Sequence, residues 1–165
     1  MRRIETALLL AALAWGTLSA VASTPPSRTP IAIVVNAANR VPDPSLAELR
    51  AMFSLERQFW PDGHRIILFL PPPGSPPRQA LLDRLYGMSD FELRKYWVGS
   101  LFRGAIPSIP STLQSTDAVI AAVQESDGAL SAAVAGPLPP TIRVLRIDGR
   151  GPDDAGYPLV VESTP

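Results

Sequence analysis

The segment from Gly74 to Arg78 combines residue types that hold small anions. Gly74 and Ser75 precede a predicted helix, and the first turn of a helix presents unpaired N–H groups and the positive end of its dipole. Ser75 adds a hydroxyl, and Arg78 adds a guanidinium that can bind an oxyanion through two parallel hydrogen bonds. Pro76 and Pro77 have no N–H, so two donors of such a cradle are missing. The same residues also fit a plain helix start, with Ser75 as the N-cap.

A second candidate position follows the first predicted strand, Ile31–Val35. Asn36 and Asn39 come soon after its last residue. Ligands of α/β proteins bind outside the carboxyl ends of the strands, so Asn36 is a candidate ligand of the same anion. Asparagine is also an ordinary turn residue, and a turn is the alternative explanation.

Groups for catalysis and metal binding are scarce. The chain has no cysteine and one histidine, His64, which excludes thiolate chemistry, disulfides and sites that need several histidines. His64 follows Trp60-Pro61-Asp62-Gly63, which predicts a tight turn with Trp60 packed on the core. A pH-sensitive role for His64 is the alternative. No spacing of paired carboxylates suits acid–base catalysis, so we expect no enzymatic activity, no metal and no cofactor.

A predicted helix over residues 91–102 is aromatic on one face and basic on the other. The residues concerned are Arg94, Lys95, Tyr96, Trp97, Phe102 and the adjacent Arg103. A core face opposite a solvated face explains this pattern. A partner-binding face is the alternative, because aromatic residues and arginines anchor interfaces. Fifteen basic and fifteen acidic side chains give no net charge, so the chain lacks the basic excess that nucleic-acid binding needs.

The N-terminus has the features of a secretory signal peptide over residues 1–22. Arg2 and Arg3 precede an apolar run, and Ala20-Val21-Ala22 has the spacing of a cleavage site. The run is about 15 residues, short of the roughly 20 that span a bilayer. A retained membrane anchor is the alternative. We expect a periplasmic or secreted mature chain that begins with a flexible lead-in over residues 23–30.

Alternating strand and helix signals organise the rest of the chain. Strands are expected at residues 31–35, 65–70, 129–135, 142–147 and 157–161, and helices at 46–54, 76–86, 91–102 and 115–125. Residues 106–114 read as a loop broken by prolines. We therefore predict a single α/β domain over residues 31–162, with a four- to five-stranded mixed sheet flanked by helices.

The order of several motifs resembles the phosphate-type periplasmic solute-binding proteins. These motifs are the strand Ile31–Val35, the segment Leu46–Phe53, the turn Trp60–Gly63, a strand that leads to Gly74-Ser75 at a helix start, Ile147-Asp148-Gly149 and Tyr157-Pro158-Leu159. The resemblance covers about Ile31 to Val161. It implies one lobe of the periplasmic-binding-protein fold, in a short, single-domain branch.

The sequence departs from that family in two ways. Full members are about twice this length, and the family's first anion-binding loop has no counterpart here. Where the family has an arginine and then Ser-Gly-Thr, this chain has Phe69 or Leu70 and then Pro73, and only Gly74 and Ser75 match. The resemblance implies an exported domain that binds phosphate or a similar anion for a transport system. The alternative is an accessory module without a solute, in contact with a membrane transporter or receptor.

Overall fold

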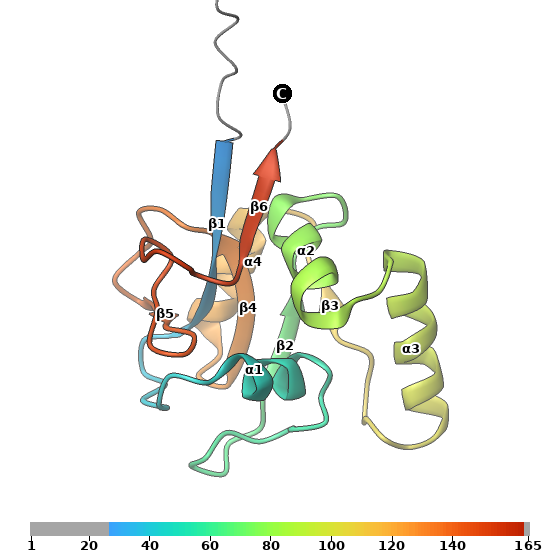
Figure 1. The fold of residues 1–165 in the computed structure, drawn as a ribbon. Coiled ribbons are helices and arrows are strands. Elements are labelled where there is room, and N and C mark those ends of the chain that lie inside the picture. Colours follow the sequence, from blue (N-terminus) through green and yellow to red (C-terminus); the bar gives the residue numbers. More distant parts are fainter. Residues whose placement is uncertain (1–26, 164–165) are drawn as a thin grey trace, which may run out of the picture.

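A mixed six-stranded sheet with helices on both faces forms the domain (Figure 1). The structure, a computed structural model, describes residues 27–163, so the signal-peptide prediction lies outside the described residues. Elements follow in the order β1 (Ser27–Asn36), α1 (Leu46–Phe53), β2 (Ile67–Leu70), α2 (Pro76–Ala80), the π-helical segment η1 (Leu81–Tyr86), α3 (Asp90–Phe102), β3 (Ser111–Thr112), α4 (Thr116–Glu125), β4 (Ala129–Val134), β5 (Ile142–Leu145) and β6 (Val160–Ser163). Among these described helices, none combines the length and apolar character that crossing a bilayer requires.

The sheet has the strand order β3-β2-β4-β1-β5, and β6 pairs with the first part of β1. Strand β1 is antiparallel to β4, β5 and β6, whereas β2 is parallel to β3 and β4. The mixed α/β class is confirmed, but the sheet has one strand more than expected. The extra strand is β3, two residues inside the predicted proline-broken loop. It is too short to show a periodicity and is defined by its pairing with Phe69 and Leu70.

Strand β1 carries a continuous apolar run, Ile31–Val35, and is buried on both faces over that run. Ile31, Ile33 and Val35 pack into the main core with side chains of α1, η1 and α3. Ala32 and Val34 face the opposite side and pack against α4 through a smaller cluster. The sheet therefore has helices on both faces, with α4 alone on one of them (Figure 1).

The flexible lead-in expected at residues 23–30 is wrong for residues 27–30. These residues form the first part of β1 and pair with β6, with Ser27 opposite Ser163 and Pro30 opposite Val160. The pairing partner lies at the far end of the chain, so local composition alone gave no signal for it. Residues 23–26 lie outside the described residues.

A capping box begins each of the helices α1 and α3. The Ser45 and Ser89 hydroxyls accept from the amides of Glu48 and Glu92, and each glutamate accepts from the serine amide in return. These backbone N–H donors stabilise the charged carboxylate and lower the pKa of Glu48 and of Glu92. The boxes fix where α1 and α3 begin.

Candidate functional site

The Gly74–Arg78 turn follows the C-terminal end of β2, as the sequence predicted. Gly74 adopts a positive φ of 74°, which the absence of a Cβ makes inexpensive. Ser75 is the N-cap of α2: its hydroxyl donates to the Pro72 carbonyl at 2.7 Å and accepts from the Arg78 amide at 3.4 Å. The Ser75 amide also donates to the Pro72 carbonyl, at 3.2 Å. Both donors of Ser75 are therefore used within the turn.

Arg78 forms an internal ion pair. Its side chain is 4% exposed, and its Nε and Nη2 donate to Asp90 Oδ1 at 2.9 and 2.6 Å. Asp90 is the first residue of α3, so the pair joins the starts of α2 and α3. The Asp90 carboxylate occupies the Nε–Nη2 edge of the guanidinium, and the buried Nη1 has no hydrogen-bond partner among the described residues.

The surface beside this turn is acidic. A shallow open hollow is lined by Gly74, Gln79, Asp83, Asp90 and neighbouring residues. Two carboxylates thus face the hollow, and the nearby positive charge of Arg78 is already paired. Because Arg78 offsets the charge of Asp90, the repulsion that an incoming anion would meet comes from Asp83, which has no cationic partner among the described residues.

Asn36 does not join this turn. Strands β1 and β2 run in opposite directions, because β1 is antiparallel and β2 parallel to β4, so their C-terminal ends lie at opposite edges of the sheet. The Asn36 side-chain amide donates to the carbonyls of Val123 and Gln124 at 3.1 and 2.8 Å. It therefore satisfies carbonyls at the end of α4. The predicted grouping of Asn36 with the Gly74–Arg78 turn is wrong, since the strand directions could not be read from the residues.

The segment around His64 forms the expected turn. Trp60 is buried, and its indole N–H donates to the Gly128 carbonyl at 3.1 Å. The exposed His64 lies with Nδ1 3.1 Å from Asp62 Oδ2. Hydrogen bonds from His64 lower the pKa of Asp62. The contacts of the pair are those of a surface turn.

The outer face of α3 is apolar and unpartnered among the described residues. Phe91, Val98 and Phe102 are 63%, 43% and 86% exposed and recur along one side of the helix. The Lys95 ammonium lies 5.6 Å from the centre of the Phe91 ring. In Figure 1, α3 stands at the edge of the molecule, beside η1. The inner face, with Leu93 and Trp97, is buried in the core.

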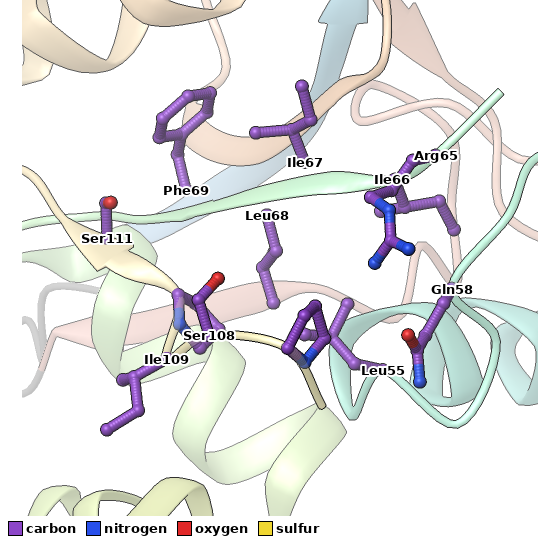
Figure 2. A pocket seen from close by; sticks show the side chains of 12 residues that line it. Leu55, Gln58, Arg65, Ile66, Ile67, Leu68, Phe69, Ser108, Ile109 and Ser111 are labelled. Atoms are coloured by element: carbon purple, nitrogen blue, oxygen red, sulfur yellow. The ribbon is translucent and has the colours of Figure 1, made fainter. Parts of the chain in front are cut away.

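A pocket of about 150 Å³ lies along β2 and the two residues before it (Figure 2). Leu55, Ile66 and Leu68 supply apolar wall, and the loop 107–111 closes one side. Arg65 lines the pocket, and Figure 2 shows its guanidinium on the Leu68 side of β2, toward Gln58. No sequence pattern marked this pocket, because its walls come from segments about 50 residues apart.

The end of α1 supplies one wall residue of this pocket. The buried Leu55 has φ 56°, in the left-handed region that side chains rarely adopt. It directly follows Ser54, the C-cap of α1, and its amide donates to the Met52 carbonyl at 3.1 Å. The left-handed conformation therefore ends the helix.

No model of a known protein family and no curated protein matches this sequence. Solved structures do match the fold. A phosphate ABC transporter substrate-binding protein from Clostridium perfringens, solved with bound phosphate, superposes with a TM-score of 0.66 at 13% identity, over 84% of this chain and 55% of the other. An ABC-type phosphate transport receptor from Vibrio cholerae gives 0.66 at 14% identity, over 83% and 55%. PstS from Borrelia burgdorferi superposes with a TM-score of 0.62 at 13% identity, over 84% of this chain and 57% of the other.

These likenesses define the class of fold. The chain has the fold of the phosphate-type solute-binding proteins, as the order of its motifs indicated. It spans a little over half the length of each of these three structures.

Proposed function

We propose that this chain is an exported, solute-binding-protein-like domain that works by contacting a membrane transporter or receptor, through the outer face of α3. The observation that carries the proposal is the exposure of Phe91, Val98 and Phe102 on one side of that helix. Large apolar side chains grouped on a surface mark interaction sites. The structural neighbours are transport proteins, which supports a transporter as the partner.

Charge indicates what kind of surface the partner presents. Arg94, Lys95 and Arg103 flank the apolar stripe, and within residues 27–163 no carboxylate pairs with any of them. Cations around an apolar centre fit a partner with an apolar patch rimmed by acidic residues. Non-enzymatic function and export, both expected from the sequence, are part of this proposal.

Site-specific crosslinking tests the proposal. A photoreactive phenylalanine analogue replaces Phe102 in cells that naturally produce the protein, and the same analogue replaces the exposed Glu56 as the control. We expect one discrete crosslinked species from position 102 and none from position 56. Crosslinking at both positions, or at neither, would contradict docking through α3.

Binding of a small anion at the Gly74–Arg78 turn is the second candidate function. Two observations favour it: the fold of the phosphate transport proteins and the conformation of Gly74, whose amide makes no hydrogen bond among the described residues. The hydrogen bond from the Ser75 hydroxyl to the Pro72 carbonyl and the ion pair between Arg78 and Asp90 weaken this candidate, because these groups already have partners. Calorimetric titration of Ser23–Pro165 with phosphate and sulfate tests it. Saturable heat that disappears in Ser75→Ala and Arg78→Ala variants would establish an anion receptor.

A further inference from the structure

The pocket under β2 has a shape fixed from both sides. The Gln58 side-chain amide donates to the Ala105 carbonyl at 2.8 Å, which ties the chain before β2 to the loop after α3. The same loop enters β3, where Ser111 pairs with Phe69 of β2. Pro107 and Pro110 stiffen the rim between these two attachments. A pocket held open in this way loses little entropy when a ligand enters.

Arg65 is the sole charged residue among those that line the pocket. Its guanidinium lies 5.1 Å from the centre of the Phe59 ring, which restrains it at the mouth. Within residues 27–163, no carboxylate pairs with it. The guanidinium is therefore free to bind a carboxylate by donating two parallel hydrogen bonds, the geometry that arginine favours.

The remaining walls define the other part of a ligand. Leu55, Ile66 and Leu68 are buried apolar side chains, and the exposed Ile109 lies on the rim. A volume of about 150 Å³ is enough for a benzene-sized group. Such walls cannot replace the hydration of an inorganic oxyanion on all sides, so phosphate and sulfate are poor fits.

We propose that this pocket binds a small monocarboxylic acid with an apolar body. The carboxylate lies on the Arg65 guanidinium, and the hydrocarbon part packs against Leu55, Ile66 and Leu68. The site is separate from the Gly74–Arg78 turn, because Arg65 precedes β2 and the turn follows it.

Amide chemical shifts of residues 23–165, which include every element of the described fold, test this proposal. Benzoate is the probe, benzamide its neutral isostere, and acetate the carboxylate without an apolar body. We expect saturable shifts around residues 65–68 and 107–111, with a dissociation constant on the order of 1 mM or below for benzoate. Benzamide and acetate should each bind at least about tenfold more weakly.

Two variants separate binding by Arg65 from non-specific attraction. Arg65→Gln should weaken benzoate binding about tenfold, whereas Arg40→Gln, which removes an exposed cation from the loop after β1, should leave it unchanged. Ser108→Phe adds bulk on an exposed loop and should abolish binding without unfolding the domain, as the unchanged amide spectrum would show. Equal benzoate affinity in Arg65→Gln and wild type, or shifts that do not saturate, would overturn the proposal.

Discussion

Removing the negative charge of Asp90 should destabilise the domain through Arg78. Loss of one partner of a buried ion pair costs about 3–5 kcal/mol, because the other charge remains buried. Arg78 is 4% exposed but Asp90 is 33% exposed, so water can reach part of the site. We therefore expect Asp90→Asn to lower the free energy of unfolding by about 2–3 kcal/mol. For a domain of this size, that lowers Tm by roughly 8–12 °C.

Thermal and urea unfolding of the variant measure this loss. The control is Glu162→Gln, which breaks an exposed pair with Arg28 whose side chains are 55% and 74% exposed. Exposed pairs contribute about 0.2–1 kcal/mol, so the control should stay close to wild type. Arg78→Met should cost less than Asp90→Asn, because it leaves no buried charge. An Asp90→Asn variant as stable as the control would refute the role assigned to this pair.

Three further predictions concern other parts of the fold. Gly128→Ala should lower the free energy of unfolding, measured in urea, by roughly 2 kcal/mol or more, because the added Cβ would lie 2.3 Å from the Arg65 carbonyl oxygen. Its control, Gly136→Ala, places the Cβ where no atom lies within 4 Å and should leave the free energy of unfolding nearly unchanged. Asn36→Ala should lower stability by about 1–3 kcal/mol in the same assay, because two carbonyls of α4 lose their donor. The pKa of Glu92 lies below its usual 4.5, so the ionised carboxylate stabilises the folded state above pH 4.5 and this contribution is lost as the pH falls through the lowered pKa. The midpoint of urea unfolding, measured from about pH 6 to about pH 3, should therefore fall more steeply in wild type than in Glu92→Gln.

Local signals predicted the elements well. The apolar run Ile31–Val35 became a strand buried on both faces, and the two capping boxes begin helices where expected. These features depend on residues within a few positions of one another, so they can be read from the sequence.

Long-range pairing set the limits of prediction. Strand β3 and the first part of β1 exist because of partners distant in the sequence, Phe69 and Val160 among them. The roles of the candidate site residues were hidden for the same reason. Asn36 binds carbonyls 87 and 88 residues away, and Arg78 is neutralised by a carboxylate on another helix. Residue type predicted the capacity of these side chains for hydrogen bonding, but their partners required the fold.

A phosphate titration of residues 23–165, followed at the amides of Gly74 and Ser75, most sharply tests the role of the turn. Ser75 uses its donors within the turn, and Arg78 is ion-paired with Asp90. We therefore expect no saturable shift of either amide up to millimolar phosphate. Saturable shifts of both amides at micromolar phosphate, lost in Arg78→Ala, would contradict this expectation and show an anion receptor.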